Sequence, residues 1–201
     1  MIPKTRYVIL SIAFGLAVAA VAMGMADKAF HAGAAADYPH QISEQVTIGA
    51  KSYNTDELTA EAFGKKADLL KYGVVPVLVV IENKRPKTLD LRFIEVSLVS
   101  ADGRHASQVK PEDLPYLASS GSKPPKISNI PVPLPKKKNP LNAPELVERA
   151  FAAKMLPPGD SASGFFYFEA KPEKGDKIYL SGLHDTPSGK EILYFEFEID
   201  P

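Results

Sequence analysis

The clearest pattern in this chain is a strict alternation of apolar and polar positions near its C-terminal end. The apolar positions of this run are Leu193, Phe195, Phe197 and Ile199. The polar side holds Tyr194, Glu196 and Glu198. A strand that alternates in this way has one face in the core and the other in water. The run therefore predicts a half-buried antiparallel strand.

The same period recurs upstream and predicts a fold rich in β-structure. The run 75–81 is apolar enough to be a central strand, and shorter alternating runs contain Val46 with Ile48, Phe166 with Phe168, and Ile178 with Leu180. Between residues 89 and 99 the apolar positions change phase, which predicts a β-bulge. Turn signals at 83–87, 102–103 and 186–189 separate the runs. Short strands joined by turns predict an immunoglobulin-like antiparallel β-sandwich.

Two helical segments interrupt this pattern. Asn54 or Thr55 can cap a helix over 56–63 that ends at Gly64. A second helix is expected over 143–155, where the apolar side consists of Leu146, Val147, Ala150 and Phe151. The sandwich should thus carry one or two short helices.

The N-terminal segment 1–36 has the layout of an export signal. Lys4 and Arg6 precede an uncharged apolar run at 8–26, and small residues at 32–36 follow it. A basic start, an apolar stretch and small residues at a cleavage site are typical of a secretory signal peptide. The run is also nearly long enough for a membrane-spanning helix, so retention as an N-terminal anchor through 8–26 is the alternative. Either outcome places the rest of the chain outside the cytoplasm: periplasmic, secreted, or held at the inner membrane.

Composition limits what the remaining residues, 37–201, can be. The formal net charge of the full chain is zero, with 24 basic and 24 acidic residues, so nothing favours a nucleic-acid partner. The chain has no cysteine, which excludes disulfides, thiolate metal sites and a lipoprotein cysteine. A segment of this length suits one domain that is stabilised by a hydrophobic core.

A proline- and lysine-rich insertion at 119–144 is the most unusual part of this domain. Between 121 and 144 lie seven prolines, five lysines and no acidic residue. Proline at this density favours polyproline II or irregular structure over a paired strand. One hypothesis is a docking arm for an acidic partner or anionic lipid, with the candidate binding residues Lys136, Lys137, Lys138, Pro131, Pro133 and Pro135. The alternative is a plain surface insertion whose apolar Ile130, Val132 and Leu134 lie against the sandwich.

Catalytic and metal-binding chemistry finds little support in the sequence. Residues 159–161 (Gly-Asp-Ser) with the pair at 184–185 (His-Asp) superficially resemble a serine hydrolase, but no G-x-S-x-G nucleophile elbow is present. His105 and His184 have no neighbour at ligand spacing for zinc. The acidic face at 196–200 could bind calcium, although a solvated strand face is the simpler interpretation. We therefore predict no catalytic residue, no cofactor and no metal, and a protein that is not an enzyme.

Three stretches carry a family resemblance. They are PVLVVIENKRPKTLDL at 76–91, SLVSADGRHAS at 97–107 and LPPGDSASGFFYFEA at 156–170. They resemble bacterial extracytoplasmic immunoglobulin-like modules of the telokin-like, DUF4352-type group, and the residues concerned are Val79, Asn83, Asp102, Gly103, Pro158, Gly159, Gly164, Phe166 and Phe168. The resemblance covers about half of the chain, which departs from the group by its insertion between 110 and 155. It implies an envelope-associated binding or assembly domain.

These observations predict an exported, non-catalytic β-sandwich that acts as a binding or assembly module in the cell envelope, with an unidentified envelope protein as its partner. The alternative is a carbohydrate-binding or hydrolase-accessory protein, in which Tyr167, Tyr179 and Tyr194 form an exposed stacking platform. A third hypothesis is an enzyme with an unrecognised site, which a buried pair of titratable groups in a cleft would favour.

Overall fold

The computed structural model describes residues 30–118, 139–186, 188–192 and 194–200. The chain divides into two compact units, Met1–His31 and Ala32–Pro201, and every element below belongs to the second. The apolar run at 8–26, expected to be helical, lies outside the described residues.

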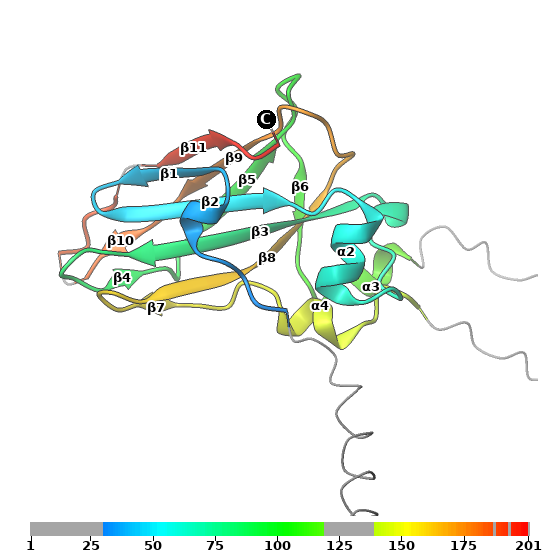
Figure 1. Ribbon diagram of the computed structural model, residues 1–201, viewed down its shortest axis with the longest axis horizontal. Coiled ribbons are helices and arrows are strands. Elements are labelled where there is room, and N and C mark those ends of the chain that lie inside the picture. Colours follow the sequence, from blue (N-terminus) through cyan, green and yellow to red (C-terminus); the bar gives the residue numbers. More distant parts are fainter. Residues whose placement is uncertain (1–29, 119–138, 187, 193, 201) are drawn as a thin grey trace, which may run out of the picture. The chain divides into compact units, whose positions relative to one another are not determined.

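The secondary structure is mainly β, with short helices between the strands (Figure 1). The strands are β1 (His40–Ser43), β2 (Val46–Ser52), β3 (Val74–Asn83), β4 (Leu89–Asp90), β5 (Glu95–Val99), β6 (Ser107–Val109), β7 (Met155–Leu156), β8 (Ser161–Glu169), β9 (Lys177–Ser181), β10 (His184–Asp185) and β11 (Phe195–Glu198). The helices are α2 (Asp56–Phe63), α3 (Leu114–Leu117) and α4 (Pro144–Glu148), with 3-10 turns η2 (Ala35–Asp37) and η3 (Leu70–Tyr72).

The five-stranded sheet, called sheet A, has the strand order β1, β2, β3, β8, β6, and all its pairs are antiparallel. The predicted central strand is confirmed as β3, in which Val77 lies opposite Ser52 of β2 and Phe166 of β8. Nearly every residue of β3 is buried. A strand covered on both faces needs apolar residues at successive positions, which explains its Val-rich sequence.

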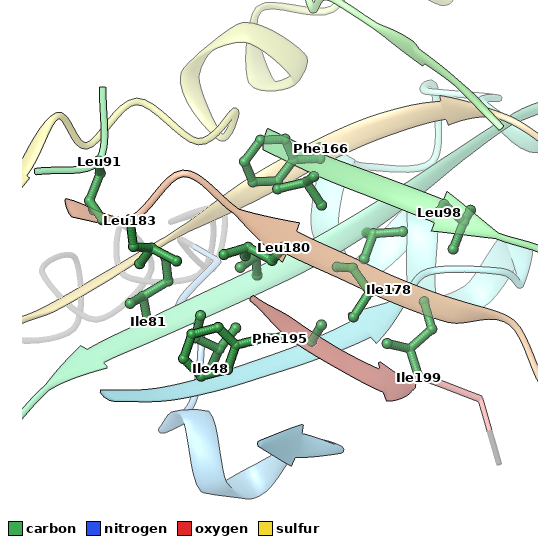
Figure 2. Close-up of a cluster of buried hydrophobic side chains, with 14 of the residues drawn as sticks. Ile48, Ile81, Leu91, Leu98, Phe166, Ile178, Leu180, Leu183, Phe195 and Ile199 are labelled. Carbon is green, nitrogen blue, oxygen red and sulfur yellow. The ribbon is translucent and has the colours of Figure 1, made fainter. Parts of the chain in front are cut away.

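Two three-stranded antiparallel sheets complete the sandwich: sheet B in the order β10, β4, β7, and sheet C in the order β11, β9, β5. Their apolar side chains form one core with the inner face of sheet A. Figure 2 shows Ile48 and Ile81 of sheet A among Leu180 and Phe195 of sheet C. The expected fold class, a mainly-β antiparallel sandwich with short helices, is confirmed.

The C-terminal alternation is confirmed from Tyr194 to Ile199, while Leu193 lies outside the described residues. Phe195 is fully buried in this core beside Phe166 and Phe168, and Phe197 packs against it while partly exposed. Tyr194 on the opposite side is 61% exposed.

The opposite face of sheet A is covered as well. Phe165 and Tyr167 of β8 alternate with the core phenylalanines and contact Phe63 of α2, with ring centroids 4.6 and 6.0 Å apart. The Tyr167 hydroxyl donates a 2.6 Å hydrogen bond to the carbonyl of Leu146 in α4. Helices α2, α3 and α4 gather at one end of this sheet (Figure 1). The expectation that Tyr167 is exposed is therefore wrong, because a helical layer covers a face expected to meet water.

Asn83 holds the predicted turn at 83–87 and is fully buried. Its side-chain Nδ2 donates hydrogen bonds to the carbonyls of Lys87 at 2.8 Å, Leu156 at 2.9 Å and Pro157 at 3.1 Å. Its Oδ1 accepts from the Arg85 N–H at 3.1 Å. One amide thus connects the turn after β3 to the segment that begins at β7.

Two local predictions need correction. The phase change between 89 and 99 is not a β-bulge but a turn, closed by the Ile94 N–H bonded to the Leu91 carbonyl at 3.2 Å, that takes the chain from sheet B to sheet C. The helix predicted over 143–155 is only the five-residue α4. It ends early because the Phe151 N–H donates to the Phe165 carbonyl at 3.1 Å, so this backbone pairs with β8.

Other local predictions are confirmed. Thr55 caps α2 through a 3.3 Å bond from the Leu58 N–H to its side chain, and Gly64 ends the helix with a φ of +79°. The turn at 102–103 is closed by the Gly103 N–H bonded to the Ser100 carbonyl at 2.8 Å. The strand that contains Val46 was expected to be the first of the chain. It is the second, because the short strand β1 precedes it and pairs with it in antiparallel orientation.

Candidate functional site

The candidate binding residues of the predicted docking arm are Lys136, Lys137, Lys138, Pro131, Pro133 and Pro135, and all lie outside the described residues. The docking arm stays a prediction, as does membrane anchoring through 8–26. Within the described part of the chain, no helix combines the length and hydropathy needed to span a membrane.

An open groove of about 650 Å³ lies at one end of the sandwich. Four segments far apart in sequence line it: 37–39 ahead of β1, residues 51–55 at the end of β2, the loop 172–174 between β8 and β9, and the C-terminal positions 199–200. The lining mixes carboxylates with amines, and its charged residues are Asp37, Glu173, Asp200, Lys51 and Lys174. The groove is therefore polar and carries both signs of charge.

Two aspartates, Asp200 and Asp176, lie at this groove. Asp200 lines it, and its Oδ2 accepts a 3.1 Å hydrogen bond from Asn54. Asp176 is only 1% exposed; its Oδ2 accepts from the Glu173 N–H at 3.2 Å, whereas its Oδ1 is buried without a hydrogen-bond partner. The two backbones bind each other, since Gly175 donates to the Asp200 carbonyl and Ile199 to the Asp176 carbonyl, both at 3.0 Å.

Both carboxyl groups hold their protons more tightly than free aspartic acid. Burial raises the pKa of Asp176, and the neighbouring charges of Glu173 and Asp102 raise it further. Burial also raises the pKa of Asp200, and the charge of Asp176 adds to this effect, partly offset by Asn54 and Lys51. Like charges in a dehydrated site favour the protonated form.

A second hollow lies at the turn between β4 and β5. The Asp90 carboxylate accepts hydrogen bonds from the Arg92 N–H and Nε at 3.0 Å and from its terminal nitrogen at 2.6 Å. These bonds lower the pKa of Asp90 to about 2. The turn presents Phe93, which is 59% exposed. Asp90 and Arg92 thus brace a turn that holds an aromatic side chain in solvent.

The hollow beneath Phe93 has a volume of about 360 Å³ and is lined by Phe93, Glu95, Ser181, Gly182, His184 and Glu191. Gly182 has a φ of +76°, and a Cβ there would fall 1.9 Å from the Phe93 carbonyl oxygen, so glycine is required. Its N–H donates to Glu191 Oε1 at 3.1 Å. His184 Nδ1 donates to the Gly182 carbonyl at 3.0 Å, which leaves Nε2 as an acceptor in the neutral ring.

Three of the residues considered for hydrolase chemistry, Gly159, His184 and Asp185, have structural partners. Asp185 accepts a 2.9 Å hydrogen bond from Lys87 Nζ, and its pKa is lowered mainly by that bond. His184 bonds to the backbone of Gly182, as described above. Gly159 belongs to a turn, with its N–H bonded to the Asn83 carbonyl at 2.7 Å. Each of these groups has a structural contact.

Metal chemistry was considered for His105, His184 and the acidic face at 196–200. Within the described ranges, no three His, Cys, Asp or Glu residues lie close enough together to hold a metal ion. On that face Glu196 accepts a 2.8 Å hydrogen bond from the Tyr179 hydroxyl.

Sequence patterns did not identify the groove or the hollow at Phe93. The groove is assembled by tertiary structure from segments that extend from Asp37 to Asp200, so no local spacing could reveal it. The Phe93 turn did have a local signal: an aspartate followed two residues later by arginine, with an aromatic residue next, is compatible with a braced turn.

No family model matches the chain, and no curated protein matches it. Two solved structures are weakly similar. A protein described as a putative lipoprotein from Bacillus subtilis is 12% identical with a TM-score of 0.39, and the match covers 81% of this chain but only 39% of that one. A DUF4426 family protein from Pseudomonas aeruginosa is 9% identical with a TM-score of 0.33, over 82% of this chain and 95% of the other. Neither similarity assigns a family, and neither protein carries the DUF4352 name of the resemblance above.

Proposed function

We propose that this protein is an exported, non-catalytic β-sandwich that acts as a binding or assembly module in the cell envelope. The observation that carries the proposal is the groove of about 650 Å³. Loops on a rigid scaffold are the usual place for binding residues. The mixed charges of the groove suit a polar partner surface, and the basic, apolar N-terminal segment supports export.

Site-specific cross-linking tests the groove as the docking site. A photoreactive residue replaces Lys174, which lines the groove, in the full chain expressed in its native host. A matched control replaces Lys66, an exposed lysine in the turn after α2 that lines neither the groove nor the hollow at Phe93. We expect a discrete cross-linked product from position 174 that is lost when Lys51→Glu is added. Equal products from both positions, or persistence after Lys51→Glu, would contradict docking in the groove.

A specific observation favours a second candidate function, an enzyme that uses the carboxyl pair for acid–base chemistry. Asp200 lines the groove and Asp176 lies behind it, both with a raised pKa. Enzymes tune general acids in this way. Asp200→Asn separates the two candidates: an acid catalyst would lose turnover in a screen of hydrolase substrates, while a binding module would keep its cross-linked product.

The carbohydrate-binding alternative has less support, because two of its three tyrosines do not form an exposed stacking surface. Its stacking platform needs three exposed tyrosines, but Tyr167 is 1% exposed and Tyr179 bonds to Glu196. Tyr194 alone is widely exposed among these three.

A further inference from the structure

We propose that the hollow beneath Phe93 is a second binding site, and that it receives a lysine or arginine side chain from a basic peptide segment of a partner protein. The hollow is distinct from the end groove. It lies beside Ser181 at the end of β9, whereas the groove reaches Lys174 ahead of the start of that strand. The proposal therefore does not depend on the function proposed for the groove.

The first argument is the rigid exposure of an apolar ring. Phe93 is 59% exposed although its turn is fixed by the Asp90–Arg92 hydrogen bonds and by the close approach of Gly182 to its carbonyl. His184 meets the ring at a centroid distance of 5.6 Å and an angle of 77°. Single exposed aromatic residues are common on protein surfaces, but one on a fixed turn loses less conformational entropy when a partner packs against it.

The second argument is the charge around that ring. Glu95 and Glu191 line the hollow, and both residues are exposed. Glu191 uses one oxygen for the Gly182 N–H, which leaves its other oxygen available as an acceptor. The neighbouring cation, Arg92, already binds Asp90 and also lies over the Phe93 ring, with its guanidinium carbon 5.7 Å from the ring centroid. The hollow therefore offers carboxylate and imidazole acceptors, and these call for hydrogen-bond donors with positive charge.

Lysine and arginine side chains satisfy both requirements at once. Their aliphatic stems pack against apolar surfaces while the charged head stays in a polar environment. In the hollow the stem would lie along Phe93 and the head would face Glu95 and Glu191. A metal ion is not favoured, because no three His, Cys, Asp or Glu residues of the described ranges lie close enough together to hold one. A sugar would bring no charge to neutralise the carboxylates. Charge complementarity therefore selects the basic side chain.

The test uses a fluorescent hexa-arginine peptide as the probe and a hexa-glutamine peptide as the uncharged control, with binding to the full chain followed by anisotropy. We expect Phe93→Ala, or Glu95→Gln combined with Glu191→Gln, to weaken hexa-arginine binding by about tenfold. Glutamine at 191 keeps an oxygen for the Gly182 N–H. The matched controls are Tyr194→Ala and Glu198→Gln, which remove an exposed aromatic and an exposed carboxylate elsewhere and should leave binding unchanged.

Affinity for hexa-arginine should also fall as salt is added, because exposed ion pairs are screened. Equal binding by wild type and by the Phe93 and glutamate variants would overturn the proposal, as would equal binding of both peptides. Suppression of peptide binding by calcium but not by salt of matched ionic strength would assign the carboxylates to a metal ion and would also overturn it. Circular dichroism of each variant confirms that a loss of binding is not a loss of folding.

Discussion

The buried amide of Asn83 is the interaction whose removal should be most informative. Asn83→Ala deletes the hydrogen bonds to the carbonyls of Lys87, Leu156 and Pro157 and the acceptor for the Arg85 N–H. The alanine leaves no side-chain group that could replace them. The turn after β3 and the segment that begins at β7 would both lose the side-chain bonds that join them, whereas the backbone bonds of residue 83 to Gly159 and Asp160 would remain.

The magnitude follows from the number of bonds. A net contribution of about 1 kcal/mol for each of four hydrogen bonds gives a loss of about 4 kcal/mol, and the Leu156 carbonyl is left without this partner in a buried position. Folded domains are typically stable by about 5–15 kcal/mol, so the variant should remain folded but be strongly destabilised.

Urea denaturation of the full chain measures this loss, followed by circular dichroism and by tyrosine fluorescence, since the protein has eight tyrosines and no tryptophan. The matched control is Asn142→Ala at an exposed asparagine, which should change the free energy of unfolding by less than about 0.5 kcal/mol. A loss for Asn83→Ala as small as that of the control would refute the assignment of this amide as the link between the two segments.

Further predictions concern the two apolar layers, the carboxyl pair and export. Phe195→Ala should cost about 3–5 kcal/mol of unfolding free energy through lost burial and a cavity, whereas Tyr194→Ala should cost less than about 0.5 kcal/mol; equal costs in chemical denaturation would argue against this strand orientation. Tyr167→Phe removes the hydrogen bond to α4 and should cost about 1–2 kcal/mol by the same assay, and no change would mean that this hydroxyl does not hold the helix. The raised pKa values mean that protonated Asp176 and Asp200 stabilise the folded state below the unfolded pKa near 3.8, and that this stabilisation is lost as pH rises through the folded values. The double Asn variant should therefore gain stability relative to wild type from pH 4 to pH 7, and a difference that stays constant or reverses would contradict the pKa directions. A C-terminal epitope should be recovered in envelope or secreted fractions, with unprocessed mass in membranes indicating an anchor; cytosolic recovery would overturn export.

Period-2 patterns predicted the strands well wherever one face meets the core and the other meets solvent. The pattern failed at β8, where Phe165 and Tyr167 lie on a face that the helical layer covers. The uninterrupted apolar run at 165–168 was the available signal, because a strand buried on both faces needs no polar positions.

The helix predicted over 143–155 failed for a non-local reason. Ala150 and Phe151 match helical spacing, yet they pair with β8 through Phe165, which is distant in sequence. Tertiary contacts override local propensity in such segments. The end groove could not be predicted for a related reason: Asp200 and Asn54 meet only when the chain is folded.

The double-sided burial of β8 has a consequence for how this protein can diverge. Phe166 and Phe168 are constrained by the sandwich core, while Phe165 and Tyr167 are constrained by the helices, so four successive positions alternate between two sets of neighbours. An insertion or deletion of one residue here would exchange the two sets of side chains between the layers. Sequences that share this fold should therefore vary freely in the loops but keep the length and the apolar character of this strand, and the strand would be the first place to look for distant relatives.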